Sequence, residues 1–362
     1  MDVDSKLDEQ EELRYIAYFQ RQLVREGSED FLAEQKVWFE RNRAQLAADF
    51  DAVSKVGGGP VGGVENPFLT HRDATEFDSL YARQIFVPIL EKSLQAAAKL
   101  GFKIQRPVMF ANSPDVEPGA CGLPSTDQHT LFIGHGVSTF CNYWSKVFAA
   151  AIYDVGSLLP HARTTEAVME SIRSNPILVT ALKLVLRYAR AESLVGFGEL
   201  KQEVHLDGFR IEVLRAMETF VVGHELGHFI LHEQFPEENG IPPGSSLRDV
   251  ELICDAYGLW ICSEVGEAEG NFSSKHLVGA LLFFCALRLC EDGQGILLGV
   301  ERAESESHPS TKDRIRHLLA FAQQADPSGI LLRYLEESLD YALILSLHIK
   351  SVLKSVSEEV NA

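Results

Sequence analysis

The chain has 362 residues, of which 46% are hydrophobic and 23% charged, and its formal net charge is −19. This is ordinary globular usage, with enough chain for one large or two modest domains and a sizeable core. The negative charge argues against nucleic acid and anionic membranes as partners.

The first residues, MDVDSKLDEQEELR, are acidic and polar, so we expect no signal peptide. The longest apolar run, 277–287, is too short to span a bilayer, and we expect no membrane insertion. The six cysteines have no paired metal-ligand spacing and are expected to be reduced thiols in a cytoplasmic protein.

Four segments follow from composition and periodicity. Residues 1–56 are predicted to form an N-terminal pair of helices with apolar stripes, and 57–66 a flexible glycine-rich linker. The main domain is assigned to 67–325, and 326–362 are predicted to form a C-terminal helix packed on that core. Because the linker would let the first helices dock and undock, they are candidates for binding a regulatory protein partner.

Within the main domain the expected order is a helix over about 79–100, a strand-rich stretch over 103–137, and helices over 142–235. The predicted fold class is therefore α+β, mostly helical with a small sheet.

The strongest chemical signal is His224-Glu225-Leu226-Gly227-His228, inside an apolar helical run. Residues four apart lie on one helix face, so both imidazoles can bind one metal ion. Glu225 projects from a neighbouring line of the helix, where a carboxylate can take a proton from metal-bound water. An ordinary buried helix is the competing interpretation, but three polar side chains would be costly to bury there without a partner.

A third ligand is expected from the next predicted helix, 247–262. Glu251 and Asp255 share one face of it, and a carboxylate on a facing helix would complete a three-ligand site with a fourth position open for water. Asp255, one turn on, is placed to accept the second ring N–H of a zinc-bound histidine. For Glu251 alone, a solvated acid on a helix face is the alternative.

The metzincin pattern requires a glycine at position 231 and a histidine at 234, and the chain has Leu231 and Gln234 there. That class is therefore excluded.

Downstream, His308 precedes Pro309, which keeps it out of the following helix, and Ser310 is a candidate cap with Asp313 three residues later. A histidine on such a loop is well placed to reach into a cleft. A capped surface helix is the simpler alternative.

Three sequence islands, HELGH at 224–228, Glu251-x-x-x-Asp255 and SHPSTKDRI at 307–315, together resemble the HtpX-like gluzincin metalloproteases. The resemblance implies a zincin-like core with Zn²⁺ held by His224, His228 and Glu251. It also implies that the His-Pro stretch and Arg314 line the substrate side. The stretch before the helical region resembles the family's substrate-binding edge strand, which would consist of Leu131, Phe132, Ile133, Gly134 and His135.

The sequence thus predicts a zinc endopeptidase acting on a protein or peptide. Glu225 would be the general base and His308 would stabilise the oxyanion. Arg314 would either share that role or pair with a buried acid. The alternative is a regulatory sensor or binding module on a zincin fold, of the phage-defence or stress-response type. The intact Glu225 favours an enzyme, because a purely structural site needs no base.

A weaker feature is Cys121 in the Gly/Pro-containing stretch 119–124. It is either a latch that binds the metal and blocks the site, or part of a turn before the edge strand.

Overall fold

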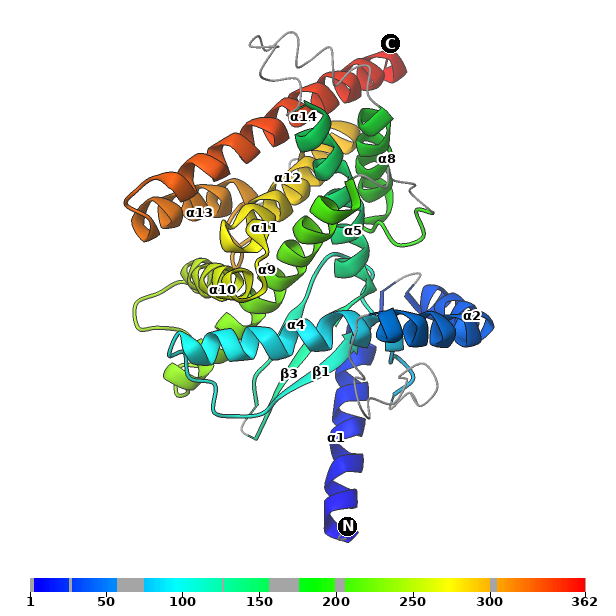
Figure 1. Ribbon diagram of the computed structural model, residues 1–362, viewed down its shortest axis with the longest axis vertical. Coiled ribbons are helices and arrows are strands. Elements are labelled where there is room, and N and C mark those ends of the chain that lie inside the picture. Colours follow the sequence, from blue (N-terminus) through cyan, green and yellow to red (C-terminus); the bar gives the residue numbers. More distant parts are fainter. Residues whose placement is uncertain are drawn as a thin grey trace.

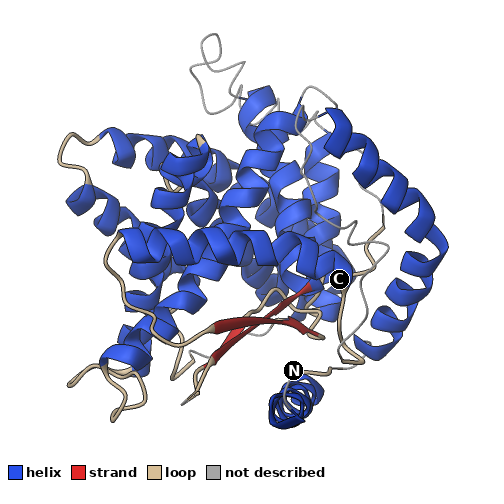
Figure 2. Cartoon of the chain, turned by 60° about the horizontal axis from the view of Figure 1, so that its bottom comes forward, coloured by secondary structure: helices blue, strands red, loops and turns tan. Residues whose placement is uncertain are grey.

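The computed structural model describes residues 3–25, 28–56, 75–125, 127–155, 176–198, 206–299 and 305–361. These residues form mostly helices around one three-stranded sheet, which confirms the predicted α+β class (Figures 1 and 2). The predicted linker over 57–66 lies outside the described residues. Among the helices described, none combines the length and the apolar content that crossing a membrane requires.

Two helices open the chain as predicted, α1 (Val3–Gln22) and α2 (Ser28–Val56). Ile16 of α1 packs on Ala111 and Phe132 of the sheet, and the Gln20 side-chain amide donates to the Asn112 carbonyl at 2.8 Å. In Figure 1, α1 descends from the sheet while α2 lies to one side of it. The N-terminal helices therefore attach to the sheet end of the molecule.

The sheet lies beneath α4 (Leu80–Lys99), whose first turn is capped by the Ser79 hydroxyl accepting the Ala82 N–H (Figure 2). Its strands are β1 (Val108–Ser113), β2 (Cys121–Leu123) and β3 (His129–Gly134). Their spatial order is β1-β3-β2, with β1 parallel and β2 antiparallel to β3.

The prediction that residues 131–135 form a substrate-binding edge strand was wrong. β3 pairs on both sides and every one of its residues is buried, so it is the central strand. Leu131, Phe132 and Ile133 pack into the core, Gly134 precedes a helix, and His135 is the first residue of that helix. An apolar run without alternation is typical of a strand covered on both faces. The edge strand on this side is β2.

The helical body follows the sheet. It consists of α5 (His135–Ala150), a π-helical turn (Ala151–Val155), α8 (Pro176–Ala191), α9 (Asp207–Gln234), α10 (Leu247–Glu269), α11 (Phe272–Lys275), α12 (Val278–Leu298), α13 (Thr311–Ala325) and α14 (Ile330–Asn361). α9 packs against α4, α5, α10 and α12, so it is central. The motif at 224–228 lies in α9 and is therefore surrounded by other helices.

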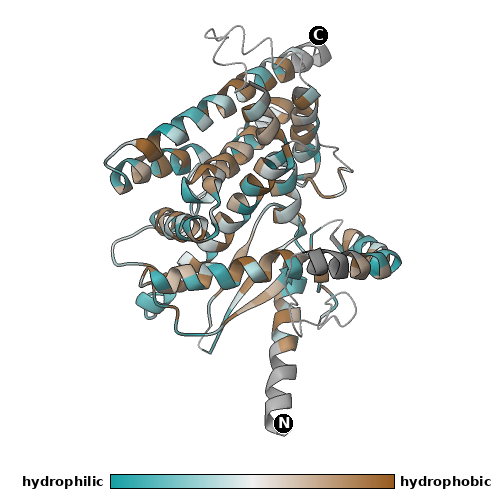
Figure 3. Cartoon of the chain, viewed as in Figure 1, coloured by the Kyte–Doolittle hydropathy of each residue, from teal (hydrophilic) through white to brown (hydrophobic). Residues whose placement is uncertain are grey.

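The C-terminal helix α14 packs along α12. Hydrophobic and hydrophilic residues are interspersed along it (Figure 3), and Leu335, Ala342 and Leu345 enter the main core. All six cysteines are free thiols, as predicted.

Candidate metal centre

The site is built where α9 and α10 approach backbone to backbone. A Cβ on Gly227 would lie 2.8 Å from the Cα of Cys254, and one on Gly258 would lie 2.9 Å from the backbone nitrogen of His224. Real Cβ atoms do not come so close, so these positions require glycine. Because the two backbones are this close, the side chain of Glu251 on α10 is long enough to reach His224 and His228 on α9.

Three predicted ligands converge at this contact. Nε2 of His224 lies 3.5 Å from Oε2 of Glu251, and Nε2 of His228 lies 3.5 Å from its Oε1. One ligand atom from each residue falls within 4.8 Å of the other two, and no other such group was found among the described residues. Two imidazole nitrogens and a carboxylate oxygen can therefore hold one metal ion.

Asp255 occupies the predicted place behind His224. Its Oδ1 lies 2.9 Å from Nδ1 of His224, and its carboxylate is almost fully buried. An ionised carboxylate can only accept, so Nδ1 carries a proton. This bond fixes the ring and directs Nε2 at Glu251, as the partners of metal-bound histidines do.

Arg314 is engaged in an ion pair with Asp255. Its Nε donates to Oδ2 of Asp255 at 2.8 Å and its Nη2 to Oδ1, which makes a two-point ion pair. The guanidinium lies over the Phe284 ring, 4.6 Å from its centroid. The catalytic assignment of Arg314 is therefore corrected: it holds Asp255, which holds His224.

The charge states follow from these contacts. Burial opposes the charged form of His224, but its bonds to Asp255 and Glu251 raise its pKa to about 9. Burial would raise the pKa of Glu251, yet the neighbouring His224 brings it down to about 2. Burial would also raise the pKa of Asp255, but the neighbouring Arg314 lowers it to about 2. Burial lowers the pKa of His228.

At neutral pH the Glu251 and Asp255 carboxylates are thus ionised, His224 carries an imidazolium proton, and the Arg314 guanidinium is paired with Asp255. A metal ion bound by the three ligands would take the place of the proton on Nε2 of His224. The donor set therefore fits a divalent cation in position.

Glu225 is buried on α9 beside the ligands but outside their group. Its carboxylate faces β2, because a Cβ on Gly122 would lie 3.3 Å from Oε2 of Glu225 and 2.9 Å from the ring of Phe229. The sequence interpretation missed this strand and assigned the edge to the stronger apolar run. One signal was available, because a glycine inside a strand often marks the close approach of another segment, and Gly122 lies beside Phe229 and Glu225.

His308 lies on the loop before α13, which begins after the Ser310 cap, as predicted. Nδ1 of His308 contacts the Ser307 hydroxyl at 2.7 Å, and its Nε2 lies 3.8 Å from Oε1 of Glu251. The Ser305 carbonyl accepts from the Arg248 guanidinium of α10, at 2.9 Å from Nε. The loop is thus tied to the helix of the third ligand, and it places His308 beside the site.

Cys121 lies in β2 rather than in a turn, and its side chain is not part of the ligand group. Burial, followed by the charge of Glu225, raises the pKa of its thiol to about 11. The thiol is therefore protonated while no metal ion is bound to it. The latch remains a prediction without support from this geometry.

Comparison of the chain with protein-family models, with curated proteins and with solved structures gave no match.

Proposed function

We propose that the chain is a zinc endopeptidase with a zincin-like core of the gluzincin type. The observation that carries the proposal is the convergence of Nε2 of His224, Nε2 of His228 and the Glu251 carboxylate. Two imidazoles and one carboxylate are a ligand set of catalytic zinc sites, which keep a further position open. Zn²⁺ bound there would supply a Lewis acid that activates water.

Glu225 is the proposed general base. It sits next to His224 on α9 but is not one of the three ligands, so its oxygens remain available to a proton. In peptide hydrolysis it would accept a proton from the attacking water and pass it to the leaving amine. The contact between Gly122 and Glu225 sets β2 directly beside this base.

The substrate would bind along β2. Within the described part of the chain this strand ends the sheet order, so its outer edge can pair with an extended peptide through main-chain hydrogen bonds. Such pairing selects backbone rather than side chains, which suits a protein or peptide substrate.

His308 is the proposed oxyanion donor. The contact of its Nδ1 with Ser307 leaves Nε2 turned toward Glu251, on the ligand side of the loop. From there an Nε2–H can donate to the carbonyl oxygen as it gains negative charge. Arg314 would act only through Asp255.

Cleavage in cells tests this proposal against the binding-module alternative. Glu225→Gln removes the base and keeps the side chain's size, while Glu212→Gln makes the same change on α9 away from the ligands. We expect new protein termini in cells with the wild-type chain and the Glu212 variant, and none with Glu225→Gln. If wild type and Glu225→Gln give the same termini, the chain is not a peptidase of this mechanism.

A further inference from the structure

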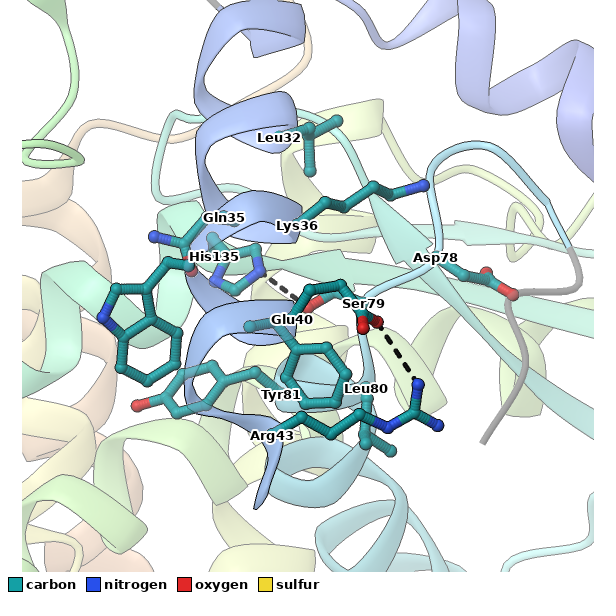
Figure 4. Close-up of a pocket in the computed structure, with 12 residues that line it drawn as sticks. Leu32, Gln35, Lys36, Glu40, Arg43, Asp78, Ser79, Leu80, Tyr81 and His135 are labelled. Atoms are coloured by element: carbon teal, nitrogen blue, oxygen red, sulfur yellow. Dashed lines mark hydrogen bonds and ion pairs between the residues drawn. The ribbon is translucent and has the colours of Figure 1, made fainter. Parts of the chain in front are cut away.

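A second site lies between α2 and the beginnings of α4 and α5, apart from the metal ligands. It is a pocket of about 370 Å³, with one wall from α2 and the other from residues 78–81 and His135 (Figure 4). That volume falls within the range of small-molecule sites.

Aromatic rings line much of the pocket. Trp38 and Phe39 come from α2, and Tyr81 from α4. The rings of Trp38 and Tyr81 belong to residues that are 47% and 52% exposed, although large apolar side chains normally avoid solvent. Rings exposed on both walls of one pocket form stacking surfaces for a planar ligand.

The core side of this pocket is rigid. His135 is buried, and its ring stacks on Tyr81 with centroids 5.7 Å apart and planes 7° from parallel. Its Nε2 lies 2.8 Å from the hydroxyl of Ser79, which also caps α4. Burial lowers the pKa of His135 to about 4, so the ring is neutral at physiological pH. The wall is therefore formed before any ligand arrives.

Positive charge lines another side. Figure 4 shows Lys36 and Arg43 extending from α2 to one side of the pocket, with Tyr81 on the other. Glu40 pairs with Arg43 at 3.3 Å, and the Glu40 side chain is 64% exposed while that of Arg43 is half-buried, so solvent screens the pair in part. The carboxylate of Asp78 is occupied by Thr75, from which it accepts two hydrogen bonds of 3.2 Å. The Lys36 ammonium donates to the Glu76 carbonyl at 2.7 Å, and an ammonium has three N–H donors. An anion at these two cations would join the existing contacts of Lys36 and compete with Glu40 at Arg43.

The backbone adds to this preference. The pocket lies at the N-terminal ends of both α4 and α5, where helix N–H groups favour negative charge. The rings and the charges together describe an amphipathic ligand.

We propose that this pocket binds a small aromatic anion, with its ring between Trp38 and Tyr81 and its anionic group at Arg43 and Lys36. Such a ligand contacts both walls, so its binding holds α2 against the core. The inference is independent of the metal centre.

Calorimetric titration of the full chain tests the ligand class. Indole-3-acetate and AMP are the probes, one an aromatic carboxylate and the other an aromatic phosphate, and they separate the two sources of negative charge. Indole-3-acetamide and adenosine lack the charge, and acetate lacks the ring. We expect at least one aromatic anion to bind about tenfold or more tightly than its neutral partner, with no binding of acetate. Binding of neither anion, or equal binding of the neutral partners, would overturn the proposal.

Two matched pairs of variants locate the binding. Arg43→Gln should weaken the anion about tenfold, whereas Arg41→Gln, on the same helix outside this pocket, should not. Trp38→Ala should do likewise, and Trp260→Ala, another exposed tryptophan, should leave binding intact. Hydrogen exchange should slow in residues 32–43 when the anion is bound. Equal losses in the control variants, or unchanged exchange in α2, would place the ligand elsewhere.

Discussion

The contact between α9 and α10 and the contact between α2 and the core are built in opposite ways. At the first, glycines bring two backbones together and a buried chain of ionised groups runs from Arg314 through Asp255 to His224. At the second, a pocket separates the helix from the core and the Glu40–Arg43 pair is partly exposed. The first arrangement leaves the metal-ligand side chains little freedom to move, while the second leaves room for a ligand between the helix and the core.

The largest expected effect on stability comes from breaking the buried chain. Arg314→Ala leaves the Asp255 charge buried with only His224 beside it, and removing one partner of such a pair costs about 3–5 kcal/mol. Denaturant unfolding at pH 7 measures the loss. The matched change at the other contact, Arg43→Gln, should cost less than about 1 kcal/mol. Similar losses of unfolding free energy in the two variants would show that the two contacts do not differ in this way.

The pH dependence of stability tests the charge state of Glu218, which lies on α9 and interacts electrostatically with Tyr81 of the pocket. Glu218 of α9 is fully buried and acts on Tyr81 of the pocket, and burial raises its pKa to about 7 despite Arg215. The folded state thus keeps a proton that the unfolded chain, with the ordinary value of 4.5, releases earlier. This contribution is complete below about pH 4.5 and is lost as the pH rises through 7.

Glu218→Gln should therefore flatten the stability profile between those limits, by an amount on the order of 3 kcal/mol. Thermal unfolding of both proteins from pH 4.5 to 8 gives the comparison. Parallel profiles for the wild-type and variant proteins would show that Glu218 titrates normally.

The His308 loop lies beside the proposed metal ligands, with Nε2 of His308 3.8 Å from Oε1 of Glu251. His308→Ala should lower turnover about a hundredfold, the scale of losing one oxyanion donor, and leave metal content and thermal stability unchanged. Ser307→Ala, which frees the ring without removing it, should fall between wild type and His308→Ala. Wild-type turnover in His308→Ala would show that the loop only caps α13 and takes no part in catalysis.

A smaller loss of stability should follow from moving α9 and α10 apart. Gly227→Ala puts a methyl group 2.8 Å from a backbone atom of α10, and overpacking of this kind costs about 1–3 kcal/mol. Metal affinity should weaken with it, because Glu251 moves away from the histidines. Gly208→Ala, on the same helix with open space around it, is the control and should cost nothing. Metal titration and unfolding of the two variants separate spacing from helix propensity.

The sequence predicted the parts of the site that depend on spacing along one helix. His224, His228, Glu251 and Asp255 lie where a period of four places them, and Ser310 caps α13 as its pattern indicates. The sequence also predicted that the next helix would bring Glu251 to the histidines, but not the order of the strands or the place of α13. The edge assigned to residues 131–135 was wrong because strand order depends on tertiary packing, and the partner of Arg314 depends on how α13 lies against α10.

Metal analysis of the chain purified without chelator tests the proposed metal centre most directly. Three residues, His224, His228 and Glu251, are the proposed ligands, and Glu225 beside them is not one. We predict about one zinc per chain in the wild-type protein, little in His228→Ala or Glu251→Ala, and the full amount in Glu225→Gln. The absence of zinc from the wild-type protein, or its loss from Glu225→Gln to the same extent as from His228→Ala, would contradict the account.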